Sequence, residues 1–155
     1  MSSYIRFFVR KYDEFAPIGV YGRSTKVYEL FSARAPWEQI APVTYEVLNA
    51  IKDDLREWAV DNAAAISKAH ARMRLIPSFT NSIEDKMDAI AEEESYLEEL
   101  NDKAKELNTA AAFISLLFDI LDAAEYSGDN GLKSNEYIYF GVECGSSVSV
   151  KNLAN

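Results

Sequence analysis

The longest pattern in this chain is a helical stripe of apolar residues between Ile83 and Glu125. Apolar residues recur there every three or four positions with no internal proline or glycine, which predicts one continuous helix. The stripe consists of Ile83, Met87, Ile90, Leu97, Leu100, Ala104, Leu107, Ala111, Ile114, Phe118 and Leu121. At about 1.5 Å per residue the helix would be roughly 60 Å long, so it needs a packing partner along its length.

A second helix, predicted over residues 44–76, supplies that partner. Thr44 begins it and Pro77 ends it, and Ser82 is the predicted N-cap of the next helix, with Asp85 three positions later. Its broad apolar face consists of Val47, Leu48, Ile51, Leu55, Trp58, Ile66, Ala69 and Met73. Because the link between the two helices is short, we expect residues 44–76 and 82–126 to form an antiparallel helical hairpin.

Strands are predicted at both ends of the chain, where apolar and polar residues alternate. Residues 4–12 and 15–21 form a predicted hairpin closed by Asp13 and Glu14, and residues 136–144 form a third strand. In the expected register Val9 faces Ile18 and Phe7 faces Val20. A short helix capped by Ser24 or Thr25 and a packed connector between Pro36 and Pro42 precede the long helices.

The predicted fold class is therefore α+β, with a small antiparallel sheet beside a long helical hairpin. The sheet combines the N-terminal hairpin with the C-terminal strand. A chain of 155 residues is expected to form a single domain over residues 1–155, with a loosely held tail at residues 145–155.

The composition predicts a cytoplasmic protein. The chain has one cysteine, Cys144, so no disulfide forms within it. The N-terminus lacks the apolar region of a signal peptide, and no stretch approaches about 18 uninterrupted apolar residues, so we expect no membrane span.

Charge is unevenly distributed along the chain. The net charge is −9, which makes binding to duplex nucleic acid or to anionic membranes unfavourable. Residues 84–106 carry ten acidic residues against three lysines, whereas residues 1–34 carry six basic residues against three acidic ones. The long helix is therefore the acidic part of the molecule.

The acidic run is the first candidate partner-binding surface. Its predicted contact residues are Glu92, Glu93, Glu98, Glu99 and Asp102. A row of carboxylates can bind a protein with a basic surface and compete with nucleic acid for it. The alternative is a solvated helix face that keeps the protein soluble.

The outer face of the sheet is the second candidate, for a partner or a ligand. The residues expected there are Tyr4, Arg6, Phe8, Arg10, Tyr137 and Tyr139, together with Tyr12, Phe15, Tyr21 and Glu143. Interleaved aromatic and arginine side chains can stack on bases or grip a protein. The alternative is that these aromatic pairs only stabilise the sheet, or that helices cover both faces.

No catalytic, cofactor or metal motif stands out. His70 is flanked by basic residues rather than carboxylates, and Cys144 falls on the predicted core face of its strand. Asp119 and Asp122 lie in an apolar helical segment with nothing that marks them for acid–base chemistry. We therefore predict a protein that is not an enzyme and uses no cofactor.

These patterns favour a cytoplasmic interaction protein, an inhibitor or regulator that binds a macromolecule through the acidic helix. Small acidic proteins with which viruses and mobile elements block host machinery have this general composition. Two alternatives remain open: a binder of nucleotides or single-stranded nucleic acid that uses the sheet face, and a structural homo-oligomer whose hairpins bundle.

Overall fold

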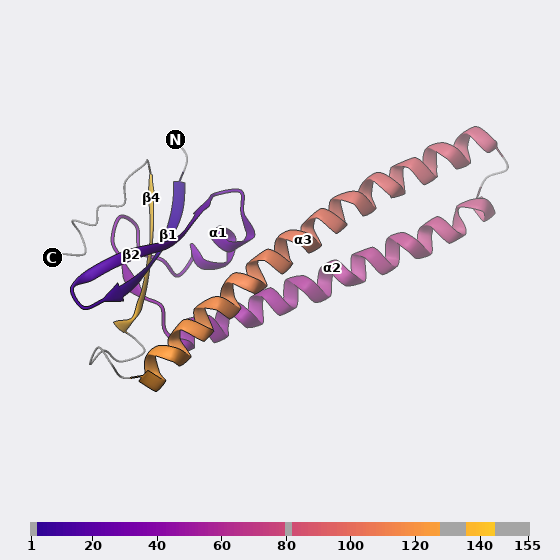
Figure 1. Cartoon of the computed structure of the whole chain (residues 1–155). Helices are drawn as coiled ribbons and strands as arrows, with labels where there is room; N and C mark the ends of the chain where they lie inside the picture. Colours follow the sequence, from indigo (N-terminus) through magenta and orange to yellow (C-terminus); the bar gives the residue numbers. More distant parts are fainter. Residues whose placement is uncertain (1–2, 80–81, 128–135, 145–155) are drawn as a thin grey trace. The chain divides into compact units, whose positions relative to one another are not determined.

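The computed structural model describes residues 3–79, 82–127 and 136–144 and has the predicted α+β fold (Figure 1). It contains a four-stranded antiparallel sheet and a long helical hairpin. The elements in chain order are β1 (Ser3–Lys11), β2 (Glu14–Gly22), α1 (Lys26–Phe31), β3 (Ala41–Pro42), α2 (Tyr45–Phe79), α3 (Ile83–Ser127) and β4 (Ile138–Cys144). The predicted tail at residues 145–155 lies outside the described residues.

The sheet has the strand order β2-β1-β4-β3. The C-terminal strand β4 pairs with β1 along its whole length, from Ser3 opposite Cys144 to Val9 opposite Ile138. The short strand β3 was not predicted, because two residues ending in a proline carry no alternating pattern. It pairs with β4 through Ala41 and Pro42, within the segment expected to be a connector.

The register predicted for the first two strands was wrong. Lys11 pairs with Glu14, so the turn residues are Tyr12 and Asp13, and Tyr12 has a left-handed φ of 57°. A bulge in β2 then shifts the register between Phe8 and Phe7, so that Phe8 faces Pro17 and Phe7 faces Gly19. Such a bulge moves every later side chain of β2 to the opposite face of the sheet.

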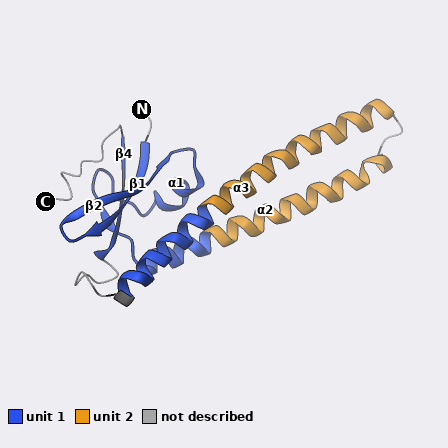
Figure 2. Cartoon of the chain, viewed as in Figure 1, with its two compact units in different colours: residues 1–54, 110–155 blue, residues 55–109 orange. Residues whose placement is uncertain are grey.

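The described chain comprises two compact units (Figure 2). Unit 1 consists of residues 1–54 and 110–155, with the sheet, α1 and one end of each long helix. Unit 2 consists of residues 55–109, in which α2 and α3 continue.

The core of unit 1 is a cluster of aromatic rings on one face of the sheet. Phe7 of β1 is fully buried, and its ring centroid lies 4.7 Å from that of Phe113 of α3 and 4.9 Å from that of Phe31 of α1. Tyr21 of β2 joins the cluster, 4.8 Å from Phe113. Tyr21 was expected on the outer face, and the bulge explains its place in the core.

Two glycines allow close approaches to the two faces of the sheet. A Cβ on Gly19 would lie 3.3 Å from the Phe113 ring, so the glycine makes room for α3 on the core face. A Cβ on Gly141 of β4 would lie 2.1 Å from the Gln39 carbonyl oxygen. The connector before β3 therefore passes directly over β4, where it also forms backbone hydrogen bonds between Glu38 and Val142 (2.7 Å) and between Val142 and Pro36 (3.0 Å).

The ends of the helices follow the predicted capping residues, with one exception. The side chains of Thr25, Thr44 and Ser82 each accept a hydrogen bond from the backbone N–H three residues later. The exception is Pro77, which was expected to end α2 but lies inside it, two residues before Phe79. Proline has a helical φ, but it lacks the N–H that would donate to the Met73 carbonyl and its ring crowds that carbonyl, and α2 continues for only two residues beyond it.

Among the described side chains of α2, all the buried residues except Ile51 recur at intervals of seven, which is the spacing of a coiled-coil seam. These residues are Leu48, Leu55, Asn62, Ala69 and Ile76.

On α3 the predicted stripe is buried at Leu97, Leu100, Leu107, Ile114 and Leu121. Three residues of the predicted stripe were wrongly expected to pack against the other helix: Ile83 is 75% exposed, Met87 is 66% exposed and Ala111 is exposed. In unit 1 the buried positions include Ala110, Phe113 and Leu117 instead, because α3 packs there against the sheet as well.

By length and composition alone, one helix in the described part of the chain could cross a membrane, namely the stretch Ile83–Glu125. Core helices of globular proteins meet the same criterion. Within unit 1, Phe113, Leu117 and Leu121 of this stretch are buried. Packing therefore accounts for part of its apolar composition, and the absence of a membrane span stays a prediction.

The first testable prediction concerns Gly141. In Gly141→Ala the new methyl group would collide with the Gln39 carbonyl, so we expect a loss of about 2–4 kcal/mol in the free energy of unfolding. Gly22→Ala is the matched control, because its nearest contact, with the Tyr4 ring at 3.9 Å, is ordinary packing. Urea unfolding of both variants measures the difference, and equal stabilities would show that the connector does not press on β4.

Candidate functional site

The first candidate surface is a row of carboxylates on the exposed side of α3, within unit 2. Seven exposed positions follow one another at spacings of three and four residues, or about 5 Å along the helix. They are Asp85, Asp88, Glu92, Ser95, Glu99, Asp102 and Glu106. We call the six acidic members the acidic stripe. No ion pair joins any of them to a basic side chain within the described residues.

Of the five acidic residues predicted to bind a partner, four are exposed. Glu92, Glu99 and Asp102 belong to the acidic stripe, and Glu98 lies beside it. Glu93 does not belong to this surface. It lies beside the seam, where its Oε1 is 2.7 Å from Arg72 Nε, and its side chain is 20% exposed. The ion pair raises the pKa of Arg72 and neutralises Glu93 as a partner contact.

The prediction also missed three members of the stripe, Asp85, Asp88 and Glu106. The signal was present in the sequence, because spacing of three and four residues places side chains on one face of a helix. Counting charge over residues 84–106 did not separate that face from the seam, which is why Glu93 was included and these three were left out.

Asn62 is the residue that the sequence prediction overlooked in the seam of unit 2. It is 4% exposed and occupies a position otherwise held by Leu55 and Ala69, seven residues to either side. Its Nδ2 donates a hydrogen bond of 3.0 Å to the Leu100 carbonyl oxygen, whereas its Oδ1 is buried without a hydrogen-bond partner. A buried polar residue in a coiled coil restricts the pairings that are available, at a cost in stability.

The second candidate surface, the outer face of the sheet, is only partly open. Phe8, predicted to be exposed there, is 2% exposed, which contradicts its assignment as a contact residue. Its cross-strand neighbours are Pro17 and Tyr139, and the Tyr139 ring packs 5.4 Å from Phe15. The connector passing over Gly141 covers a further part of this face.

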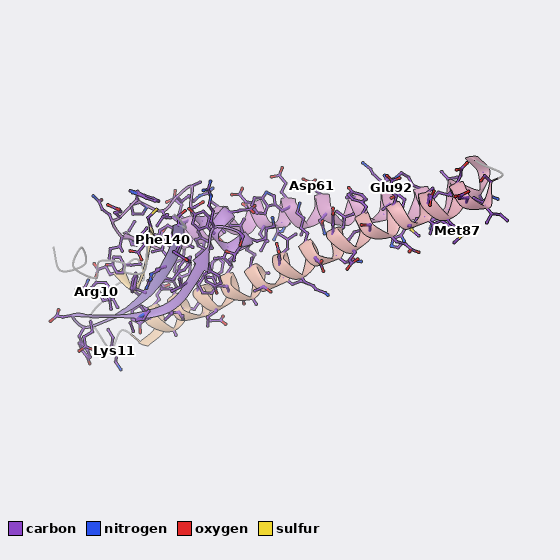
Figure 3. All side chains as sticks on the ribbon, turned by 90° about the horizontal axis from the view of Figure 1, so that it is seen from above. Arg10, Lys11, Asp61, Met87, Glu92 and Phe140 are labelled. Carbon is purple, nitrogen blue, oxygen red and sulfur yellow. The ribbon has the colours of Figure 1, made fainter. Side chains whose placement is uncertain are left out.

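Most of the other residues predicted on this face lie at intermediate burial, whereas Tyr12 at the turn is 64% exposed and Glu143 is buried. Tyr4, Arg6, Arg10, Tyr137 and Tyr139 are all half-buried. Arg10 lies near the turn between β1 and β2 (Figure 3), where its Nε donates to the Tyr12 carbonyl oxygen at 3.0 Å and its guanidinium lies 5.8 Å from the centre of the Phe15 ring. These contacts resemble the cross-strand packing that stabilises sheets more than an open stacking platform.

Arg6 and Glu143 form an ion pair on this face. Arg6 Nε lies 2.9 Å from Glu143 Oε1, and the Glu143 side chain is only 7% exposed. Burial raises the pKa of Glu143, the Arg6 charge lowers it in part, and the nearby Glu38 raises it again. Arg6 therefore balances a buried carboxylate, and this role limits its use as a contact for a nucleic acid or a protein.

The remaining candidates for chemistry lie apart. Among the described residues, no group of three or more His, Cys, Asp and Glu side chains is placed to hold a metal ion. His70 is exposed, and Cys144 is half-buried rather than in the core as predicted. Asp122 accepts a hydrogen bond of 2.6 Å from the Tyr45 hydroxyl, and burial and this bond raise the pKa of Tyr45.

Comparison of the chain with protein-family models, with curated proteins and with solved structures gives no match. The candidate surfaces are therefore assessed from their own geometry and charge.

The second testable prediction concerns Asn62. Replacing Asn62 by Leu removes an unsatisfied buried acceptor and adds apolar packing, so we expect the variant to gain about 1–3 kcal/mol in unfolding free energy. Asn101→Leu, at an exposed position of α3, is the control and should change stability by less than about 0.5 kcal/mol. Thermal and denaturant unfolding measure both, and a loss of stability in Asn62→Leu would contradict the prediction.

The third prediction is a pH dependence. Arg6→Ala leaves Glu143 buried without its cation, and we expect a loss of about 1–2 kcal/mol at about pH 7. The pKa of Glu143 in the folded state is already raised above the ordinary 4.5, and the substitution raises it further. Folding then favours the protonated form, so the destabilisation grows as the pH rises from below 4.5 through that raised pKa.

The control for this prediction is Arg10→Ala, which breaks a hydrogen bond to a backbone carbonyl and leaves no carboxylate buried. Unfolding free energies of both variants are measured at about pH 4 and about pH 7. An equal loss for Arg6→Ala at the two pH values would show that Glu143 does not depend on Arg6.

Proposed function

We propose that this protein is a non-enzymatic inhibitor or regulator that binds a basic macromolecular surface through the acidic stripe of α3. The observation that supports this proposal best is the arrangement of the stripe. Six of seven consecutive positions on one exposed helix face are acidic, and none forms an ion pair within the described residues. These charges are therefore available to a partner.

The distribution of basic residues in unit 2 supports the same proposal. On α2, Arg72 is engaged with Glu93 and with the Tyr96 ring, 5.6 Å away, so its charge balances Glu93 and not a residue of the stripe. From Asp85 to Glu106 the stripe runs for roughly 30 Å along a single rigid element. Except across Ser95, neighbouring charges of the stripe lie about 5–6 Å apart along the helix, closer than the Debye length of about 8 Å, so their fields add at a partner's surface.

The sheet face remains an alternative site for a nucleotide or single-stranded nucleic acid. It receives less support, because Phe8 is buried and Arg6 is paired with Glu143. Stacking on successive bases requires several exposed rings, and only Tyr12, at the turn between β1 and β2, is exposed among the aromatic residues predicted there.

The fourth prediction tests the stripe by electrostatics. The variant Glu92→Gln, Glu99→Gln and Glu106→Gln removes three stripe charges with little change in shape or helix propensity. The matched control, Asp53→Asn, Glu57→Gln and Asp61→Asn, removes three exposed charges from α2 (Asp61 and Glu92 are labelled in Figure 3). We expect the stripe variant to reduce the association rate at low salt by about tenfold and the control by much less.

The measurement starts with affinity capture by the full chain from cells of the source organism and mass spectrometry of the retained proteins. Association rates of the purified partner are then recorded at low and physiological salt for the wild type and both variants. An association rate that is independent of salt, or equally reduced in both variants, would contradict partner binding by the acidic stripe and would indicate a solvated helix face.

A further inference from the structure

One flank of the helical hairpin in unit 2 is apolar without being covered. Met87 of α3 is 66% exposed, and Ile66 and Met73 of α2 are half-buried. Unit 2 contains five of the nine large exposed apolar side chains in the described chain, and of these five only Met87 is assigned to this flank. These five are Val60, Leu75, Ile83, Met87 and Tyr96.

The intervals between residues along each helix place Ile66, Met73 and Met87 on the same side of the seam. On α2, Arg72 and Met73 follow the buried Ala69 by three and four residues, so they lie on opposite sides of it. We call the side of the seam on which Arg72 lies the first side. Arg72 contacts Glu93 and Tyr96, which assigns these two residues of α3 to the same side. Met73 and Ile66, seven residues earlier, therefore lie on the second side.

The same reasoning applies to α3. Glu93 and Glu94 follow Ile90 by three and four residues, so Glu94 lies on the side opposite to the Arg72 contact. Met87, seven residues before Glu94, shares that side. We call Ile66, Met73 and Met87 the apolar flank, and Glu94 and Glu98, both exposed, its acidic border.

From this arrangement we infer that the apolar flank and its acidic border bind a basic amphipathic helix of a partner protein, laid along the hairpin. Ile66 and Met73 are seven residues apart, or about 10 Å, which matches the repeat of apolar side chains on an amphipathic helix. Methionine adapts to varied apolar surfaces. The carboxylates of Glu94 and Glu98 complement lysine or arginine side chains beside the apolar face of such a helix.

This inference rests on the proposed function, since it names the chemistry of the partner that the acidic helix would bind. It adds a requirement that charge alone does not impose: the partner's basic residues must belong to a helix with one apolar face. A net charge of −9 disfavours two other occupants, a second copy of this chain and an anionic membrane.

The experiment uses the full chain and a synthetic peptide of about 20 residues, long enough to form a helix on binding. The peptide contains only leucine and lysine, with leucine every three or four positions. A peptide of identical composition in scrambled order has the same charge and no apolar face. Isothermal titration calorimetry at physiological salt should give at least about tenfold tighter binding for the amphipathic peptide.

Two variants locate the binding site. Met87→Ser removes an exposed apolar side chain from the flank, and we expect about tenfold weaker binding of the amphipathic peptide. Leu75→Ser is the matched control, because Leu75 is 51% exposed and belongs to the other side of the hairpin, one residue before the buried Ile76. It should bind the peptide as the wild type does, and circular dichroism verifies that both variants are folded.

The outcomes separate this inference from the proposed function. If both peptides bound equally and with strong salt dependence, the acidic stripe would keep its proposed role and the helix-binding flank would be wrong. If neither peptide bound, both would be wrong. Equal weakening by Met87→Ser and Leu75→Ser would also overturn the inference, as would peptide binding that neither variant changes.

Discussion

Packing of Phe113 against Phe7 is the contact on which the organisation of unit 1 depends. It joins the central strand β1 to α3 through two residues more than a hundred positions apart in the sequence. Phe31 of α1, Tyr21 of β2 and Phe140 of β4 complete the cluster around it. Aromatic pairs in edge-to-face or stacked geometry combine large buried area with orientation, so one cluster positions three strands and two helices. Gly19 is the condition for this packing, since a side chain there would press on the Phe113 ring.

Unit 2 is organised by a different principle, a coiled-coil seam whose two helices differ in charge. Arg72 of α2 pairs with Glu93 of α3 beside the seam, and Asn62 donates across it to the Leu100 carbonyl. Both interactions lie in or beside the seam, and neither involves a residue of the exposed acidic stripe. The polar groups that stabilise the hairpin and those proposed to bind a partner are thus separate sets on the same helix.

Most of the fold was predictable from the sequence, whereas the candidate sites were predictable only in part. Helix periodicity located α2 and α3 to within three residues at each end, and alternation located β1, β2 and β4. These patterns are local and repeat many times, so a single irregularity does not hide them. The bulge in β2, the two-residue strand β3 and the connector over Gly141 were not predicted, because each depends on one or two residues whose partners are distant in the sequence.

The sequence by itself determined the fold class, the acidic character of α3 and the capping residues Thr44 and Ser82, all of which follow from composition and local spacing. It left the cap of α1 open between Ser24 and Thr25, and the structure selects Thr25. Only the tertiary structure decided which acidic residues are available: Glu93 is engaged by Arg72, whereas Glu92 and Glu99 are exposed. It also decided that Phe8 is buried and that Arg6 balances Glu143. The physical reason is that burial and ion pairing are properties of contacts between distant segments, and a pattern along one segment carries no record of them.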